Sequence, residues 1–179
     1  ESHGWERPKW FSLNGENEEL GFRRGNAFSA VGEECVAVRE RVGVMDLSSF
    51  AKFEVFGPHA EKMLDRLCAN RLPQGLGRIC LTHMLTKNGC IESEMTMTRL
   101  GDNFFYVLSG AGAEEKDLDI MTQGKLADED VTIRNITDEY GILVLTGPNS
   151  RDVLSRLTDV SLENTDFKWL TAKEIDIDG

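Results

Sequence analysis

Residues 82–100 read THMLTKNGCIESEMTMTRL, and this stretch does most to decide the fold. Its Asn88-Gly89 pair stands between two runs rich in apolar residues, which is the strongest short-range signal for a β-hairpin. Glu and Met are poor strand formers, so acids in the middle of the second strand indicate a specific role or an exposed face. Because side chains alternate along a strand, one face is expected to carry Ile91, Ser93, Met95 and Met97, and the other Glu92, Glu94, Thr96 and Thr98.

A second pattern occurs twice along the chain. FEVFGPHAEKMLDRL (53–67) and LVLTGPNSRDVLSRL (143–157) align with one offset of 90 residues, since 147 − 57 = 90 for their glycines. Each predicts a strand, a Gly-Pro break and a helix, because proline is tolerated at the first position of a helix. The two units indicate an internal duplication; the alternative is that a common helix-start motif arose twice by chance.

The rest of the chain predicts a mixture of helices and strands. Apolar spacing predicts helices over 30–42 and 113–123, and alternation predicts strands at 104–110, 131–136 and 170–179. The residues expected on the inner face of the first helix are Val31, Cys35, Val38 and Val42. We therefore expect an α+β fold with a largely antiparallel sheet, helices on one side and duplicated strand–Gly-Pro–helix units.

The start of the chain has a different character. Residues 1–28 are rich in glycine, tryptophan and charge and show no period. A loop this long is uncommon inside a compact domain, so we expect a junction segment, held in place by Trp5, Trp10 and Phe11. The folded domain is expected over residues 29–179.

Composition excludes several classes of function. The chain has 179 residues, of which 40% are hydrophobic, and a formal net charge of -11. This charge argues against non-specific binding of nucleic acid, which depends on a basic surface. No apolar run reaches the length of a membrane span, and no basic start leads into an apolar stretch. We expect no nucleic-acid or membrane partner, and an intracellular compartment.

The four cysteines, Cys35, Cys68, Cys80 and Cys90, have irregular spacing and no CxxC pair. We therefore expect no metal site. Disulfides stay open as an alternative, because four is an even number. The apolar neighbours of each cysteine favour reduced, buried thiols.

Few residues offer catalytic chemistry. The chain has no GxGxxG motif, no Walker loop and no nucleophile elbow. His3 and His59 do not fall in ligand-like positions, whereas His83, near the hairpin, is either functional or structural. Glu94 also has two interpretations: a solvated residue on the open face of a sheet, or a carboxylate under a covered face, poised to accept a proton.

Three stretches together resemble the folate-binding aminomethyltransferase family, which includes the glycine-cleavage T-protein and the C-terminal halves of dimethylglycine and sarcosine dehydrogenases. They are VGVMDLSSFAKFEVFGPHAEKMLDRLCAN (42–70), HMLTKNGCIESEMTMTRLGDNFFYVLSGAGAEEKDL (83–118) and LVLTGPNS (143–150). The similarity runs over most of 21–179 with the motifs in the same order. The leader GWERPKWF (4–11) resembles the segment that joins the flavin and folate halves of those dehydrogenases.

The resemblance implies a T-protein-like fold, with residues 29–179 as the N-terminal part of the folate-binding domain of a larger protein. It implies tetrahydrofolate as cofactor, Glu94 as the catalytic carboxylate where the family usually has Asp, and Phe50 as an apolar folate-lining residue. Leu81 stands where T-proteins carry a folate-binding Tyr, and Gly110 where they carry an Asn. A leucine cannot donate a hydrogen bond, and Gly110 offers only its backbone. FAD is expected only in an upstream flavin domain.

The function expected from this resemblance is transfer of a one-carbon unit from an iminium, formed from a methylated amine, to tetrahydrofolate. The alternatives are a folate-dependent methyltransferase with another methyl donor and a non-catalytic scaffold that retains the fold. We expect the chain alone to be inactive, the face of Glu94 to be enclosed, and the location to be cytoplasmic, or the mitochondrial matrix in a eukaryote.

Overall fold

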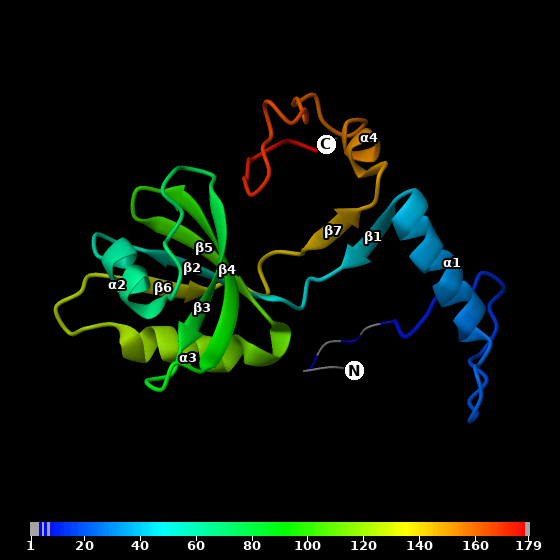
Figure 1. The fold of residues 1–179 in the computed structure, drawn as a ribbon, viewed down its shortest axis with the longest axis horizontal. Coiled ribbons are helices and arrows are strands. Elements are labelled where there is room, and N and C mark those ends of the chain that lie inside the picture. Colours follow the sequence, from blue (N-terminus) through cyan, green and yellow to red (C-terminus); the bar gives the residue numbers. More distant parts are fainter. Residues whose placement is uncertain (1–3, 5, 7, 178–179) are drawn as a thin grey trace. The chain divides into compact units, whose positions relative to one another are not determined.

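The computed structural model describes residues 4, 6 and 8–177, and these form two compact units. The first unit contains the described residues up to Asp46, Leu143–Val160 and the end of the chain from Asp176. The second unit contains Leu47–Ile142 and Ser161–Ile175. Both are built from the helices and strands labelled in Figure 1.

The second unit is built on a five-stranded antiparallel sheet in the order β3-β4-β5-β2-β6. Its helices α2 and α3 lie beside the strands in Figure 1, and both contribute to a single buried core on one face of the sheet. This confirms the predicted α+β class with an antiparallel sheet and helices on one side. The elements of this unit are β2 (Ala51–Phe56), α2 (Ala60–Leu67), β3 (Ile79–Leu85), β4 (Ile91–Gly101), β5 (Phe104–Ser109), the 3-10 turn η1 (Ala111–Ala113), α3 (Glu114–Gly124) and β6 (Thr132–Asn135).

Alternation along the strands decides what the core contains. The core-facing residues of β2, β4 and β5 are buried from Ser93 onward, because the helices cover this face of the sheet. Lys52 and Thr98 are buried on the other face as well. The predicted placement of Met95 and Met97 on one face of the strand is confirmed, and both are buried there. The fully buried side chains of this face include Phe53, Val55, Met95, Met97, Phe105 and Val107, and the helices add Met63, Leu64 and Met121.

The hairpin contains an irregularity that the sequence did not reveal. Leu85 pairs with Ile91 and Met84 with Ser93, so Glu92 is an extra residue in β4 and the register shifts there. Such a bulge interrupts the alternation of side chains. The prediction that Ile91 lies on the same face as Met95 and Met97 was therefore wrong, and Ile91 is 67% exposed.

The two Gly-Pro units share one local structure. In each, a strand ends at a glycine with positive φ, 127° at Gly57 and 118° at Gly147. The amide of Ala60 then donates to the carbonyl of Gly57, and the amide of Ser150 to that of Gly147, at 3.0 and 3.1 Å. The helices that follow are α2 and α4 (Ser150–Leu154).

The first unit has few elements. β1 (Gly43–Asp46) and β7 (Leu143–Thr146) form a two-stranded antiparallel sheet, which Figure 1 shows as two adjacent arrows. Helix α1 (Ala27–Glu40) precedes it and contains no buried residue. The inner face predicted for this helix was therefore wrong within the described part of the chain: Val31, Cys35 and Val38 are exposed and Val42 is half-buried.

Three smaller predictions also failed. Among the described residues of 170–179, no strand forms, and only an isolated bridge joins Thr171 to Arg78. Of the predicted anchors of the leader, Phe11 is exposed and Trp10 half-buried, while Trp5 lies outside the described residues. The four cysteines are free thiols, but only Cys68 is buried; Cys35 and Cys90 are exposed and Cys80 is half-buried. The domain boundary at residues 28/29 stays a prediction.

Candidate functional site

The four site residues expected from the sequence lie near one end of the five-stranded sheet: Phe50, Leu81, Glu94 and Gly110. His83 pairs with Glu94 across β3 and β4. In the next row, Ser109 lies between Met95 and Ala51. Gly110 and Phe50 therefore continue the row of Glu94, one step beyond the last paired residues of β5 and β2.

Leu81 belongs to the same face of the sheet. It lies two residues before His83 on β3 and pairs with Thr96, which pairs in turn with Leu108. Because side chains two apart point to the same side of a strand, these residues lie opposite the helix-covered core. We call this surface the open face, defined by Leu81, His83, Glu94, Thr96 and Leu108.

The open face is accessible to solvent. The side chain of Glu94 is 62% exposed and Leu81 is 50% exposed. The enclosure expected around the carboxylate is therefore not provided by the described residues of this unit. Leu108 and Thr96 are half-buried, so the face combines apolar contact area with one reachable carboxylate.

His83 is the residue that sequence reasoning left unassigned. Its Nε2 lies 3.0 Å from Oε2 of Glu94, and its side chain is 33% exposed. A carboxylate only accepts hydrogen bonds, so the imidazole donates through Nε2–H. The register of the hairpin would have revealed this pair. The sequence does not give that register, because the bulge at Glu92 shifts it by one residue.

A buried lysine supports the chain next to Phe50. The Nζ of Lys52 donates to the carbonyl oxygens of Ser48 and Phe50, at 2.7 and 2.8 Å. Its backbone amide donates to Oγ1 of Thr137 at 3.0 Å. Lys52 is fully buried, and these bonds hold the turn that leads into β2.

Farther along the same face, the next row of the sheet contains Thr98, Tyr106 and Glu54. Burial raises the pKa of Tyr106 to about 12, and the nearby Tyr140 and Glu54 act in the same direction. Arg134 Nη2 lies 2.8 Å from Oε2 of Glu54. Tyr106 is therefore a neutral hydroxyl at physiological pH, and the charge of Glu54 is matched by Arg134.

Gly110 leaves its surroundings open. A Cβ at this position would meet no atom within 4 Å. Its φ of -68° and ψ of 141° are accessible to any residue. The absence of a side chain is therefore not required by the backbone, and it leaves the main chain beside Glu94 uncovered.

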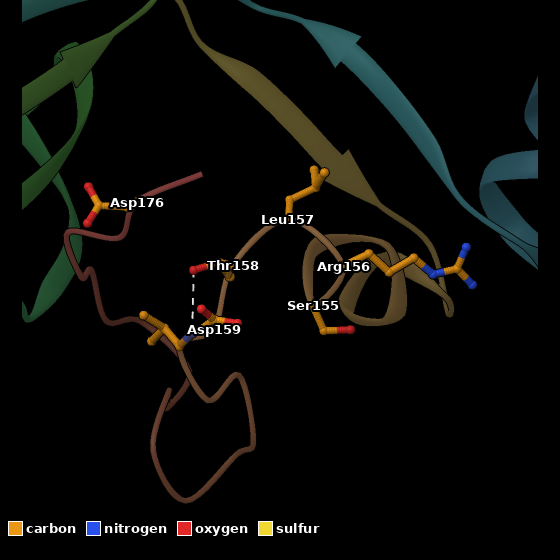
Figure 2. A pocket seen from close by; sticks show the side chains of 7 residues that line it. Ser155, Arg156, Leu157, Thr158, Asp159 and Asp176 are labelled. Atoms are coloured by element: carbon orange, nitrogen blue, oxygen red, sulfur yellow. Dashed lines mark hydrogen bonds between the residues drawn. The ribbon is translucent and has the colours of Figure 1, made fainter. Parts of the chain in front are cut away.

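A hollow in the first unit involves none of these residues. It is lined by Ser155, Arg156, Leu157, Thr158, Asp159, Val160 and Asp176. Figure 2 shows that Arg156 and Asp176 extend in opposite directions and that Thr158 bonds to the backbone of this loop. The side chains do not converge on a common point, so the hollow does not form a recognisable site.

Two further kinds of feature concern the part of the chain that the structure describes: clusters of metal ligands and membrane-spanning helices. No group of three or more His, Cys, Asp or Glu side chains in residues 4, 6 and 8–177 could hold a metal. Within the same residues, no helix combines the length and apolar character that crossing a membrane requires.

Comparison with known proteins identifies relatives over the whole chain. The family model described as the GCVT N-terminal domain matches residues 1–179. The chain is 41% identical over 177 residues to mitochondrial dimethylglycine dehydrogenase of Rattus norvegicus, an alignment that covers 97% of this chain and 20% of that protein. The chain thus spans a fifth of the length of this relative.

Two further comparisons extend this result. The chain is 30% identical over 184 residues to the mitochondrial pyruvate dehydrogenase phosphatase regulatory subunit of Mus musculus, covering 99% of this chain and 21% of that protein. The crystal structure of the glycine cleavage system aminomethyltransferase T from Bartonella henselae matches with a TM-score of 0.69 at 21% identity, covering 79% of this chain and 38% of that one. The structural match confirms the predicted T-protein-like fold.

Proposed function

Because the chain belongs to the GCVT N-terminal domain family, we propose that it is the folate-binding part of a flavin-dependent N-methyl amine dehydrogenase of the dimethylglycine or sarcosine type. The identity of 41% with a dimethylglycine dehydrogenase supports this choice within the family. The small-molecule partners are then a folate and a methylated amine. The mitochondrial relatives favour the mitochondrial matrix in a eukaryote and the cytoplasm otherwise.

The observation that carries the proposal is the shared position of Phe50, Leu81, Glu94 and Gly110 at one end of the open face. Apolar side chains at the same end of the sheet as one carboxylate suit a flat heterocycle with a reacting nitrogen, because apolar contact binds the ring and a few polar groups orient it. The uncovered backbone at Gly110 allows close approach. These residues therefore fit a folate in their chemistry.

Tetrahydrofolate, when bound, supplies the nucleophilic nitrogen that takes up the one-carbon unit. Glu94 acts as a general base and accepts the proton released at that nitrogen. Phe50 and Leu81 hold the ring near the carboxylate by apolar contact. Two reactants held side by side react faster than free reactants do. Positioning on this face therefore favours attack of the folate nitrogen on the iminium over hydrolysis of the iminium to formaldehyde.

Oxidation of the amine requires a flavin. The chain has no dinucleotide-binding glycine motif, and we assign FAD to an upstream domain of the full-length protein. The chain alone would then have no oxidase activity. The relatives, about five times as long as the match, leave ample length for such a domain.

A non-catalytic scaffold is the second candidate, and one comparison favours it. The relative named as a phosphatase regulatory subunit is 30% identical across 99% of this chain. Leu81 and Gly110, where T-proteins carry Tyr and Asn, remove two polar side chains from the face. A folate-dependent methyltransferase with another methyl donor is the third candidate, and an upstream flavin domain would argue against it.

Calorimetry with tetrahydrofolate on the full-length protein tests folate binding. Leu81→Asp places a charge on the open face and should weaken binding at least about tenfold, since burying an unpaired charge against a ring is costly. Leu76→Asp is the matched control, because Leu76 is also exposed and lies in a loop of the same unit. Absence of binding by the unchanged protein would favour the scaffold.

A further inference from the structure

His83 and Glu94 face each other directly across β3 and β4. They form a register pair, and Nε2 of His83 lies 3.0 Å from Oε2 of Glu94, within hydrogen-bond distance. This pairing depends on the extra residue Glu92, since without the bulge His83 would lie opposite Ser93. The carbonyl of Glu92 accepts a hydrogen bond from Nζ of Lys116 in α3 at 2.5 Å.

The bond occupies one oxygen of the carboxylate and leaves the other free. Among the described residues, His83 is the only side chain that bonds to Glu94. A glutamate has several rotatable bonds, and an exposed one samples many rotamers. A single directed bond to Oε2 restricts these rotamers and leaves Oε1 available to a ligand.

We propose that His83 is a positioning residue that holds Glu94 so that Oε1 faces the reacting nitrogen. The inference rests on the proposed function, because it assigns a role within the same face. His83 supplies a donor through Nε2 in both its neutral Nε2–H form and its protonated form. Either form of His83 can therefore donate a hydrogen bond to the carboxylate of Glu94.

The alternative is an ordinary surface pair, which contributes little to the protein. Positioning and surface pairing predict different kinetics. Loss of a positioning contact lowers kcat and leaves the binding of tetrahydrofolate unchanged, because the carboxylate remains but is no longer held. Loss of a surface pair changes neither.

The test compares His83→Leu with His83→Gln in the full-length protein, with methylenetetrahydrofolate formation as the readout. His83→Leu should lower kcat about tenfold, in the range known for supporting contacts of functional groups, with KM for tetrahydrofolate unchanged. His83→Gln should recover most of the rate, because its side-chain amide N–H reaches the same oxygen. Equal kcat in His83→Leu and the unchanged protein would overturn the proposal, as would equal losses in both variants.

An NMR measurement separates this inference from the proposed function. With ¹⁵N-labelled histidine, the unchanged protein should show a proton on Nε2 of His83 that is protected from exchange, and Glu94→Ala should remove the protection. A proton found on Nδ1 alone would overturn the proposal, because Nε2 could not then donate. This readout needs no folate, so it tests the His83–Glu94 bond on which the proposal depends even where folate binding is absent.

Discussion

Gly57 and Gly147 have similar positive φ angles, 127° and 118°, at positions 90 residues apart, since 147 − 57 = 90. In both, a Cβ would press on backbone: 2.6 Å from the carbonyl oxygen of Asp130 at Gly57, and 2.7 Å from that of Arg41 at Gly147. The amides of His59 and Asn149 donate to these same two carbonyls. The two strand–helix units are therefore alike in conformation and in how their turns are held.

Gly57→Ala should destabilise the protein by about 2–5 kcal/mol, because backbone strain and a close backbone contact both oppose the new methyl group. Gly89→Ala is the control: Gly89 also has positive φ, but a Cβ there would meet no atom within 4 Å. Gly89→Ala should lower the free energy of unfolding by only about 1–2 kcal/mol, which is the contribution of backbone strain alone. Urea unfolding of both variants measures the difference, and equal costs would contradict the role of the contact.

Asp117→Asn should stabilise the protein by about 1–3 kcal/mol. Asp117 in α3 is fully buried, and neither carboxylate oxygen has a hydrogen-bond partner. A carboxylate costs more free energy to bury without partners than a neutral amide does, and the substitution makes this exchange with little change of shape. Asp119→Asn on the exposed side of α3 should have no such effect. A lower unfolding free energy for Asp117→Asn in chemical denaturation would contradict this account of α3.

The Arg66–Glu129 pair should make the free energy of unfolding depend on pH in the acidic range. Hydrogen bonds from Arg66 and from the Leu126 amide lower the pKa of Glu129 from 4.5 to about 2. A carboxylate whose pKa is lower in the folded state than in the unfolded state stabilises the fold at pH values above its unfolded-state pKa. This stabilisation is lost as the pH falls from about 4.5 toward 2. Denaturation midpoints across this range should fall less steeply in Glu129→Gln than in the unchanged protein. Parallel pH curves would show that the pair does not contribute.

The cysteines should differ sharply in reactivity. Burial raises the pKa of Cys68 to about 11, so at pH 8 its thiolate fraction is on the order of 10⁻³. Cys35 and Cys90 are exposed and should react first with iodoacetamide. Peptide mass spectrometry over time measures each rate. Labelling of Cys68 in the folded protein as fast as that of Cys90 would be inconsistent with its place in the core.

Local patterns predicted those elements whose signals lie within a few residues. The Asn88-Gly89 turn, the two Gly-Pro helix starts and the burial of Met95 and Met97 all follow from nearby sequence. The bulge at Glu92 does not follow from nearby sequence. The carbonyl of Glu92 accepts a hydrogen bond from Lys116 of α3, 24 residues farther along the chain. The His83–Glu94 pair was therefore beyond reach of the sequence alone.

The failed strand prediction at 170–179 has a different cause. The alternation of Ile175 and Ile177 suits a strand, but a strand forms only where another offers a ladder of hydrogen bonds. Here the nearest pairing is the single bridge between Arg78 and Thr171. The site residues were selected by resemblance to a family. Their position on one face follows from the registers of four strands, which no local pattern specifies.

The most direct measurement of the central claim is the rate of methylenetetrahydrofolate formation by Glu94→Gln in the full-length protein, with amine oxidation followed in parallel. If Glu94 is the general base, formation should slow by about 10²–10⁴-fold while amine oxidation continues. Glu92→Gln, a neighbouring acid on the same strand, should change neither rate. Methylenetetrahydrofolate formed by Glu94→Gln as fast as by the unchanged protein would contradict the account.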